Sequence, residues 1–403
     1  MEHDGENADA PRLRDRGQGQ GNSPNPPTEP KTVGSGGPWR TGGRRRATGR
    51  HMNGRGGGGP FYAALDLGTN NCRLLVAHPT RRAFRVVDSF SRIVRLGEGM
   101  GRDGRLSEAA MTRAVDALAV CRDKMISRQV ARYRLIATEA CRSAENSEEF
   151  LERVHARTGM QLEIVSREIE AQLAVSGCAS LVDPEAKGVI VFDIGGGSTE
   201  LIWLDFRTSG RPRAAGLSRH ISTWSSLPFG VVTVAERFGG REVTRQTFEE
   251  MVAFTQEHLS DFPGRAAMTE ALAGGHVHLL GTSGTVTTIC GVHLGLERYD
   301  RRRVDGAWMR DTDVLEVTER LIEMSYEQRV GNPCIGSDRA DLVLAGCAIF
   351  EAIRREWPCK RVRVADRGLR EGVLLTLMNE DGVWRKNRGE GAPPPTVEAG
   401  SSG

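Results

Sequence analysis

The sequence lacks the features that would place a protein in a membrane or carry it across one. No apolar run reaches the roughly 18 residues of a membrane-spanning helix, and the N-terminus has neither the charged start nor the apolar core of a signal peptide. The eight cysteines are dispersed, with no Cys-x-x-Cys pair and no His-rich segment beside them, which favours reduced thiols over a zinc site. These absences predict a soluble, cytoplasmic protein without a membrane partner.

The sequence also lacks a dominant charge. Lys and Arg number 55 against 52 Asp and Glu, so the formal net charge is +3. This balance excludes a nucleic-acid coat or a membrane-surface polycation as a description of the whole chain. Binding partners therefore have to be inferred from local sites.

Two tails contain almost no large apolar residues. Residues 1–59 are mainly Gly, Pro, Arg, Asn and Ser, and residues 386–403 have a similar composition. Such segments bury too little apolar surface to offset chain entropy, so both are predicted to be disordered. The Arg- and Gly-rich part of the first tail is either a contact for RNA or polyphosphate or a merely solvated extension.

Between the tails, the apolar periodicity alternates between strand and helix, which predicts an α/β fold. The predicted strands are residues 61–65, 73–77, 84–87, 134–138, 162–165, 189–192, 277–280 and 362–365. The predicted helices are residues 107–129, 147–157, 168–180, 286–291, 339–356 and 369–378.

One pattern occurs twice along this region. Asp66-Leu-Gly-Thr-Asn-Asn-Cys-Arg73 and Asp193-Ile-Gly-Gly-Gly-Ser-Thr-Glu200 each follow an apolar strand and lead into a second one. A duplicated hairpin with an Asp at the same corner suggests two similar domains that face one another across a cleft. We assign residues 60–183 to the first domain and residues 184–385 to the second.

Glycine-rich turns after strands are suited to anion binding, because no Cβ keeps the backbone N–H groups away from the ligand. The turn from Gly195 to Ser198 fits this use, and Gly281-Thr-Ser-Gly-Thr285 is a third such loop, followed by a helix N-terminus. The alternative is a hairpin that needs glycine only to turn. Two copies, each led by an Asp, favour a phosphate site.

An Asp at the end of a strand beside a phosphate loop is well placed to hold Mg²⁺ or another hard divalent cation, usually through water. Asp66, Asp193 and Glu200 are the candidate ligands. The alternative is that each Asp caps its own turn.

An ordered set of motifs over about residues 60–380 resembles the Ppx/GppA phosphatase family. The motifs are Asp66-x-Gly-x-Asn-x-x-Arg73-Leu, Ala137-Thr-x-Ala-x-Arg142, Asp193-Ile-Gly-Gly-Gly-Ser-Thr-Glu200, Leu227-Pro-x-Gly-x-Val, Gly281-Thr-Ser-Gly-Thr285 and Asp366-Arg-Gly-Leu-Arg-Glu-Gly372. The resemblance implies two ribonuclease-H-like domains of the actin/Hsp70/sugar-kinase superfamily. It also implies Mg²⁺-assisted hydrolysis of a terminal phosphoryl group in the cleft between them, as in the short, two-domain members.

The resemblance implies that Glu170 is the general base that activates water. Glu168 and Glu170 lie about 100° to either side of Ile169, so only one of them can face the cleft if Ile169, Leu173 and Gly177 face the core. The family usually has Ser-Gly-x-Glu-Glu-Ala here. In this chain Arg167 replaces the Gly and Ile169 the first Glu, which leaves Glu170 aligned with the base; the alternative is an exposed helix glutamate.

The remaining site residues are also implied by the resemblance. Arg73 and Arg142 are expected to bind phosphate oxygens rather than form ordinary ion pairs, and Arg92 and Arg95 to hold the next phosphates of the substrate. Thr69 and Asn71 replace the serines of the family's first loop, so hydroxyl contacts are in doubt at Asn71. The full predicted phosphate-binding set is Asn70, Arg73, Arg92, Arg95, Thr138, Arg142, Gly195, Gly196, Gly197, Ser198, Gly281, Thr282, Ser283, Gly284 and Thr285.

The leading functional hypothesis is an exopolyphosphatase that releases orthophosphate from the ends of inorganic polyphosphate. Hydrolysis of the 5′ γ-phosphate of guanosine pentaphosphate is the close alternative, because both substrates present a terminal phosphoanhydride. An ATP-dependent kinase or an actin-like ATPase is the alternative from another class. It should carry an adenosine-binding glycine pair late in the second half, whereas Gly274-Gly275 precedes the third loop. A homodimer is among the expected assemblies.

Overall fold

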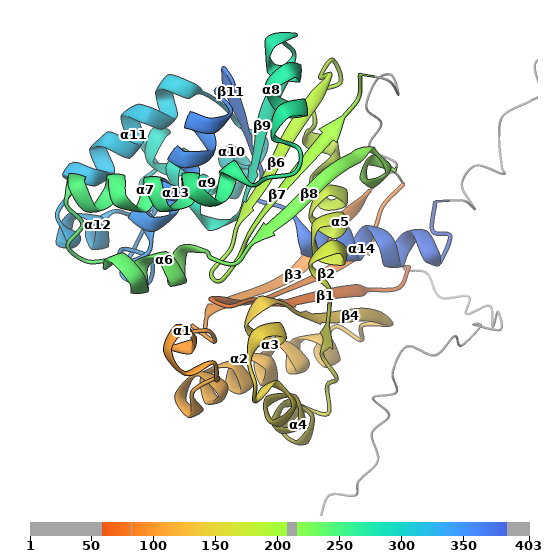
Figure 1. Cartoon of the computed structure of the whole chain (residues 1–403). Coiled ribbons are helices and arrows are strands. Elements are labelled where there is room, and N and C mark those ends of the chain that lie inside the picture. Colours follow the sequence, from red (N-terminus) through yellow and green to blue (C-terminus); the bar gives the residue numbers. More distant parts are fainter. Residues whose placement is uncertain (1–58, 82, 208–215, 385–403) are drawn as a thin grey trace, which may run out of the picture. The chain divides into compact units, whose positions relative to one another are not determined.

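The computed structural model describes residues 59–81, 83–207 and 216–384, in which strands and helices alternate as the predicted α/β class requires (Figure 1). Apart from Gly59, the two predicted disordered tails lie outside the described residues, and so does the RNA contact considered for the first of them. Within the described part, every helix is too short or too polar to cross a bilayer.

The first sheet has the strand order β3-β2-β1-β4-β5. Its strands are β1 (Tyr62–Leu67), β2 (Asn71–Pro79), β3 (Phe84–Ile93), β4 (Arg132–Ala137) and β5 (Glu163–Ile164). The first three strands form an antiparallel meander, and β4 and β5 join it in parallel.

The second sheet has the order β10-β11-β9-β6-β7-β8. Its strands are β6 (Gly188–Ile194), β7 (Thr199–Asp205), β8 (Ile221–Leu227), β9 (Val277–Thr282), β10 (Trp308–Arg310) and β11 (Arg361–Val364). From β8 to β11 the order and the directions repeat those of the first sheet, with β10 added at the edge. The internal repeat predicted from the two Asp-Gly patterns is therefore a repeat of whole sheets.

The two hairpins agree down to single hydrogen bonds. Asp66 lies opposite Arg73 in the first, and Asp193 lies opposite Glu200 in the second. The turn of the first is closed by a bond from Gly68 N to Asn71 O, and that of the second by a bond from Gly195 N to Ser198 O, both at 2.9 Å. The same backbone therefore carries opposite charges at the second position of each pair.

Fourteen α-helices surround the sheets in the described part of the chain. They are α1 (Met100–Asp103), α2 (Glu108–Ser127), α3 (Glu139–Ser143), α4 (Ser147–Thr158), α5 (Arg167–Cys178), α6 (Val231–Phe238), α7 (Arg245–Ser260), α8 (Arg265–Ala273), α9 (Ser283–His293), α10 (Arg301–Val304), α11 (Asp311–Glu323), α12 (Tyr326–Gly331), α13 (Val343–Glu356) and α14 (Leu369–Glu380). Two 3₁₀ turns, Ala179–Leu181 and Leu217–His220, complete the set. The side chains of Ser107 and Ser166 cap α2 and α5 by accepting backbone N–H groups of the first turn.

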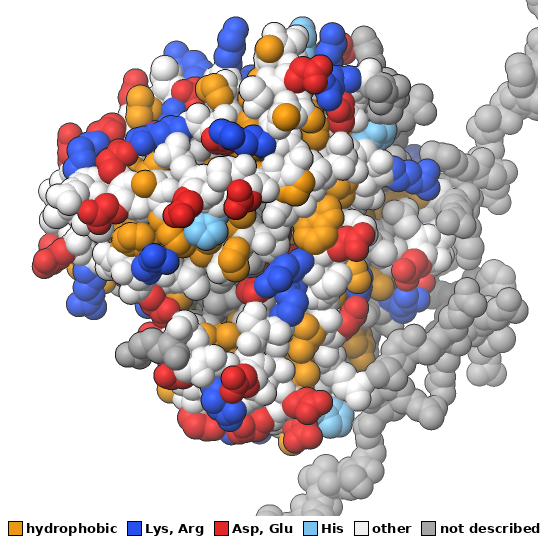
Figure 2. Space-filling view, viewed as in Figure 1, with side chains coloured by type: hydrophobic (Ala, Val, Ile, Leu, Met, Phe, Trp, Pro, Cys, Tyr) orange, Lys and Arg blue, Asp and Glu red, His pale blue; other side chains and the backbone are white. Residues whose placement is uncertain are grey.

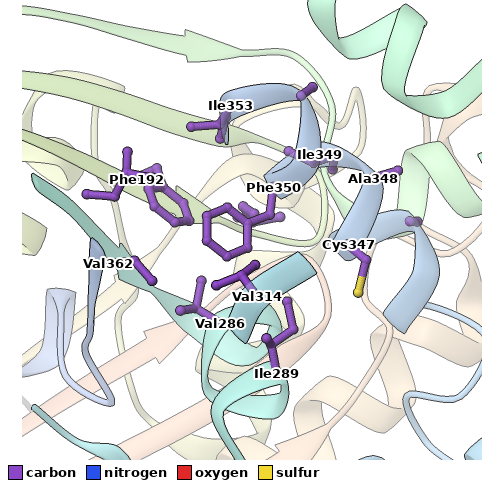
Figure 3. Packing of buried hydrophobic residues seen from close by; sticks show 14 of the residues in the cluster. Phe192, Val286, Ile289, Val314, Cys347, Ala348, Ile349, Phe350, Ile353 and Val362 are labelled. Atoms are coloured by element: carbon purple, nitrogen blue, oxygen red, sulfur yellow. The ribbon is translucent and has the colours of Figure 1, made fainter. Parts of the chain in front are cut away.

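A hydrophobic cluster holds the second sheet against its helices (Figure 3). The rings of Phe192, from β6, and Phe350, from α13, lie 4.8 Å apart between centroids. Val286 and Ile289 of α9 pack in the same cluster. Because Phe192 directly precedes Asp193, this packing fixes the end of β6 at which the Gly-rich turn begins.

The last helix, α14, packs on the first sheet although it follows the second one in sequence (Figure 1). Leu369, Val373, Leu374, Leu377 and Met378 of this helix share a buried cluster with residues of β1, β2 and β4. Two glycines allow it to approach α5, because a Cβ on Gly177 would lie 1.9 Å from the carbonyl oxygen of Gly368 and one on Gly372 would lie 2.0 Å from that of Leu173. The domain boundaries stay a prediction. α14 was assigned to the second domain by sequence, but it packs on the sheet of the first.

Candidate active site

A cavity open to solvent lies where the turns of the two hairpins meet. Fifteen of the predicted site residues line it: Asp66, Asn70, Arg73, Thr138, Glu170, Asp193, Gly195, Gly196, Gly197, Ser198, Glu200, Thr282, Ser283, Gly284 and Thr285. Arg92, Arg95, Arg142 and Gly281 were also predicted, and they do not line it. The sequence motifs from both halves of the chain therefore converge on one place.

The second Gly-rich turn presents its amides because its carbonyls are already engaged. The carbonyl oxygens of Gly195 and Gly196 accept hydrogen bonds from Val231 N and Val232 N at the start of α6, both at 2.9 Å. In a trans peptide the N–H points opposite to the C=O, so the N–H groups of Gly196 and Gly197 point away from α6. Neither donates a hydrogen bond within the described chain, which leaves two donors for an anion.

The first turn is arranged in the same way. The carbonyl of Thr69 accepts from Gly97 N at 2.9 Å, and the carbonyl of Asn70 accepts from Val94 N at 2.9 Å. The side-chain Oδ1 atoms of Asn70 and Asn71 are buried without a hydrogen-bond partner in the described chain. Asn71, where serine is usual in the family, therefore brings an unused polar group to the cavity wall.

Gly196 serves a further purpose that the sequence did not reveal. A Cβ at this position would lie 3.0 Å from the Cβ of Thr69 and 3.1 Å from the backbone N of Asn70. The two hairpin turns are thus in direct contact, and Gly196 makes that contact possible. The predicted role of leaving room for the substrate is joined by that of leaving room for the other turn.

The third predicted loop is the junction of a strand and a helix. Gly281 and Thr282 end β9, and Ser283 begins α9 with a left-handed φ of 83°. The Oγ of Ser283 is buried and has no hydrogen-bond partner in the described chain. Gly281 itself faces the core, since a Cβ there would lie 2.5 Å from the ring of Phe192, so it is a packing residue and not a phosphate ligand.

The three predicted metal ligands, Asp66, Asp193 and Glu200, are among the acidic residues of the cavity wall. Burial raises the pKa of Asp66, against the lowering effect of Arg370 and Arg73, and burial also raises the pKa of Asp193. Burial together with the charge of Asp193 raises the pKa of Glu200 to about 7, while hydrogen bonds from Ser198 and Ser226 oppose that rise. Burial therefore disfavours the charged form of all three carboxyl groups.

This donor set fits a hard cation only in part. Among the described residues, no three His, Cys, Asp or Glu side chains are close enough to hold a metal ion by themselves. Mg²⁺, however, takes one or two carboxylates and completes its shell with water and phosphate oxygens. Asp66 and Asp193, one from each hairpin and each desolvated, fit that requirement, whereas Glu200 accepts a hydrogen bond from Ser226 at 2.9 Å.

Glu170 lies in the first turn of α5 and reaches the cavity. Burial raises its pKa well above the usual value, the charge of Glu200 raises it further, and Arg142 lowers it. The Nη2 of Arg142 donates to Oε2 of Glu170 at 3.1 Å. A carboxylate with a raised pKa at the edge of an anion site has the character of a general base.

The helix that carries Glu170 faces the core differently from the prediction. Leu173 and Gly177 are buried as predicted, but Ile169 is 36% exposed and does not belong to the core stripe. Ala171 and Ala174 take its place, because α5 begins at Arg167 and its first turn projects beyond the core. Glu168 is exposed and accepts a hydrogen bond from Gln172, so the choice of Glu170 stands on the cavity and not on the predicted stripe.

Arg142 lies behind Glu170 and not in the cavity wall. Its Nε and Nη2 donate to Glu139 at 3.1 and 2.7 Å, and its Nη1 donates to the carbonyl of Val165 at 2.6 Å. Arg167 donates to the same glutamate at 2.8 Å. The donors predicted to bind phosphate are therefore engaged in a network centred on Glu139. Burial raises the pKa of Glu139, but hydrogen bonds from Arg167, Ser143 and Arg142 lower it to about 2.

Arg92 and Arg95 are also elsewhere. Arg92 is exposed at the edge strand β3, over the ring of Phe90. Arg95 pairs with Asp341 at 2.9 Å, between the segment after β3 and the segment before α13. Arg95 thus joins the two halves of the chain, and neither residue is placed to hold a phosphate at the cavity wall.

Sequence reasoning missed three arginines of the wall, one of which, Arg367, pairs with Asp305. Arg339 precedes α13 and Arg370 lies in the first turn of α14. Together with Arg73, they have no ion pair and no side-chain hydrogen bond to any residue in the described part. Arg370 belongs to the quoted motif Asp366–Gly372, so that motif carried the signal, whereas nothing in the local pattern distinguishes Arg339.

One face of the described part of the chain carries charges of both signs. On the face shown in Figure 2, Lys and Arg side chains are interspersed with Asp and Glu. The charges that could select a ligand on chemical grounds are those of the cavity.

Known proteins resemble this chain over most of its described length. A sequence model of the Ppx/GppA phosphatase family matches residues 75–381. Exopolyphosphatase 2 of Mycobacterium tuberculosis is 27% identical over 329 residues, which cover 78% of this chain and 98% of that protein. The Aquifex aeolicus member of the Ppx/GppA family superimposes with a TM-score of 0.64 at 26% identity, covering 80% of this chain and 98% of that one. An exopolyphosphatase from Cytophaga hutchinsonii reaches a TM-score of 0.68 at 22% identity, covering 79% and 98%. These similarities confirm the predicted fold of two ribonuclease-H-like halves.

Proposed function

The chain belongs to the Ppx/GppA phosphatase family, and on that premise we propose that it is an exopolyphosphatase, a phosphoanhydride hydrolase that releases orthophosphate from the ends of inorganic polyphosphate. The observation that carries the proposal is the set of three arginines, Arg73, Arg339 and Arg370, that line one cavity without an ion pair or hydrogen bond in the described chain. Guanidinium groups that form no ion pair within the described chain suit a ligand that is an anion at every unit.

The backbone supports the same class of ligand. The N–H groups of Gly196 and Gly197 donate nothing within the described chain, and α9 and α14 both begin at the cavity wall. Helix N-termini and free turn amides stabilise phosphate groups by donating hydrogen bonds to the phosphate oxygens. The cavity therefore has donors for several phosphate oxygens at once.

Glu170 is proposed to act on the water. It accepts a proton from a water molecule while the water oxygen forms a bond to the terminal phosphorus. The bond from that phosphorus to the bridging oxygen breaks, its electron pair stays on the shortened polyphosphate, and orthophosphate leaves. Arg142, hydrogen-bonded to Glu170 at 3.1 Å, holds the carboxylate in one orientation.

Asp66 and Asp193 are proposed to hold Mg²⁺ together with water and substrate oxygens. The ion, when bound, would neutralise charge on the phosphates. The two carboxylates alone repel one another, as the raising effect of Asp66 on the pKa of Asp193 indicates. A divalent cation would relieve that repulsion.

Guanosine pentaphosphate remains the second candidate substrate, because its terminal phosphoanhydride offers the same reacting group. Phosphate release should be compared for short polyphosphate, long polyphosphate and guanosine pentaphosphate, each with Mg²⁺ and with chelator. We expect both polyphosphates to be hydrolysed faster than guanosine pentaphosphate, in a Mg²⁺-dependent manner. Preference for guanosine pentaphosphate would overturn the proposed substrate, and ATP consumption without polyphosphate hydrolysis would favour the kinase or ATPase alternative.

A further inference from the structure

The motif Asp366–Gly372 at the start of α14 contains two arginines with very different surroundings. Arg367 pairs with Asp305 and donates to Ser180 at 3.1 Å. Arg370, one helical turn later, has no ion pair and no side-chain hydrogen bond in the described chain. One arginine of the motif is thus fixed by the protein, and the other is left without a partner.

Two of the three acidic groups that act on Arg370 are engaged elsewhere. Glu371 accepts hydrogen bonds from Arg301 Nη2 at 2.8 Å and from Gly368 N at 2.9 Å. Asp366 accepts from the hydroxyl of Tyr299 at 2.7 Å. Both carboxylates therefore have partners of their own, and Arg370 is left facing the cavity.

A half-buried arginine that forms no ion pair and no side-chain hydrogen bond is costly for the folded protein. Arg142 pairs with Glu139 and Arg354 with Glu351. Arg329, which is 2% exposed, has no ion pair in the described chain but donates to the carbonyl of Arg241, whereas Arg370 has no hydrogen-bond acceptor there either. Burial lowers the pKa of Arg370, in accordance with its desolvated position near Arg73 and Asp66. A residue that lowers the stability of the fold without a structural role is typical of functional sites, where it serves binding or catalysis.

The location of Arg370 specifies the part of the substrate it would meet. The charges of Asp66 and Arg73 both act on the guanidinium of Arg370. These two residues lie opposite one another on β1 and β2, at the end of the first hairpin. α14 is packed on that same sheet, so Arg73 and Arg370 are held by one rigid unit. Two guanidinium groups beside one carboxylate form a site for a single phosphoryl group.

We propose that Arg370 is a catalytic residue that contacts the oxygens of the transferred phosphoryl group and, with Arg73, neutralises the charge that spreads over them as the bridging bond breaks. This rests on the proposed phosphoanhydride hydrolysis. Arg370 gains and loses no proton in the step, because its guanidinium acts only as a fixed cation.

The test compares Arg370→Met with Arg370→Lys and with the control Arg363→Met. Arg363 is also half-buried with a pKa lowered by burial, but it stacks on Trp308 away from the cavity. With polyphosphate as substrate, we expect Arg370→Met to lose at least about 100-fold in kcat/KM, Arg370→Lys to recover part of it, and Arg363→Met to keep full activity.

Thermal melting with inorganic phosphate separates catalysis from folding. The melting temperature of Arg370→Met without ligand should equal or exceed that of the unsubstituted protein, since the substitution removes a half-buried cation that forms no ion pair. The rise in melting temperature produced by inorganic phosphate should shrink in Arg370→Met and persist in Arg363→Met.

Two results would overturn the inference. One is full activity and an unchanged phosphate-induced shift in Arg370→Met. The other is a lowered melting temperature with activity lost equally in Arg370→Lys and no change in the phosphate shift, which would make Arg370 a structural residue. Failure of the unsubstituted protein to hydrolyse polyphosphate would instead reject the proposed function, and the phosphate shift would still decide whether Arg370 binds the anion.

Discussion

Arg142 donates a hydrogen bond from Nη2 to Oε2 of Glu170 at 3.1 Å. All other nitrogens of that guanidinium are also engaged, with Glu139 and with the carbonyl of Val165. Arg142 therefore positions the proposed base. It does not line the cavity, so it is not placed to contact the substrate. Glu139, which holds Arg142, should therefore affect catalysis through Arg142.

Glu170→Gln should lose at least about 100-fold in kcat with KM changed by less than about threefold, because the carboxylate acts on the water in the transition state and the amides and arginines bind the ground state. Steady-state kinetics on polyphosphate measure both constants. Glu168→Gln is the matched control, since Glu168 is exposed and accepts a hydrogen bond from Gln172, and it should be nearly silent. Equal small losses in both variants would mean that water is activated by another group.

Glu139→Gln should lower kcat about tenfold with little effect on KM, because Arg142 loses the charge that holds it behind Glu170 and pairs more closely with the base. The free energy of unfolding should fall by about 2 kcal/mol, since charge-assisted hydrogen bonds from two arginines are weakened.

The control for this network is Glu163→Gln, which removes a partly exposed pair with Arg134. It should leave kcat intact and cost at most about 1 kcal/mol in urea unfolding. If Glu139→Gln behaved like Glu163→Gln in both measurements, the network would have no part in catalysis.

Asp193→Asn should abolish Mg²⁺-stimulated hydrolysis without unfolding the protein. The substitution removes a carboxylate whose pKa burial raises, so the neutral amide is tolerated in the fold while a ligand for the cation is lost. Phosphate release titrated with Mg²⁺, with Asp88→Asn as a control that breaks a surface ion pair, measures the effect. Full activity in chelator would contradict the role given to Asp193.

Gly196→Val should raise KM strongly, and the melting temperature should fall because the side chain crowds the first turn. The new side chain would displace the turn at Thr69 and Asn70 and cover the free amides. Gly331→Ala, at a position with open space around it, is the neutral control. An unchanged KM and kcat would show that the second turn needs glycine only to bend.

His278 predicts a pH dependence of stability. Burial lowers its pKa to about 4 from the usual 6.5. Its Nδ1 lies 2.9 Å from the carbonyl oxygen of Leu279, and its Nε2 accepts from Asp183 N at 3.4 Å, an arrangement of the neutral ring. Between pH 4 and 6.5 the unfolded chain therefore binds the extra proton, so the contribution of His278 is complete above pH 6.5 and is lost as pH falls toward 4.

The expected loss over that range is about 3 kcal/mol of unfolding free energy. Urea unfolding at several pH values between 7 and 4 measures it. In His278→Gln this component is missing, so the stability difference between the two proteins should narrow as the pH falls. A constant difference would mean that the pKa of His278 is the same in the folded and the unfolded chain.

The repeat was predictable because its signals are local. An apolar strand, an Asp, a Gly-rich turn and a second apolar strand lie within a dozen residues, and the register that pairs Asp66 with Arg73 follows from the length of the turn. The sheet order then follows from the duplication. The start of α13 at Val343 and not at Arg339 was not predictable, because Asp341 is engaged by Arg95 from the other half of the chain.

The site was predictable where one motif supplies both the residue and its surroundings, as at Gly196 and Asp193. It was not predictable where the partner comes from elsewhere. Arg142 and Arg370 are both arginines of quoted motifs, and only tertiary contacts decide that the first is occupied by Glu139 and the second by nothing in the described chain. Gly281 was predicted to bind phosphate because it begins the third Gly-rich loop. In the structure, the ring of Phe192 lies so close that only glycine fits there.

The position of α14 has a consequence for the order of events during synthesis of the chain. The face of the first sheet formed by Tyr62, Ala64 and Leu75 is covered by Leu374 and Met378, which leave the ribosome roughly three hundred residues later. Until then that apolar face has no cover, and the first half of the chain, although its strands are contiguous in sequence, is not a finished folding unit. Premature termination anywhere before Leu369 would therefore yield a product that exposes the inside of its first sheet, a substrate for chaperones and proteases rather than a smaller enzyme.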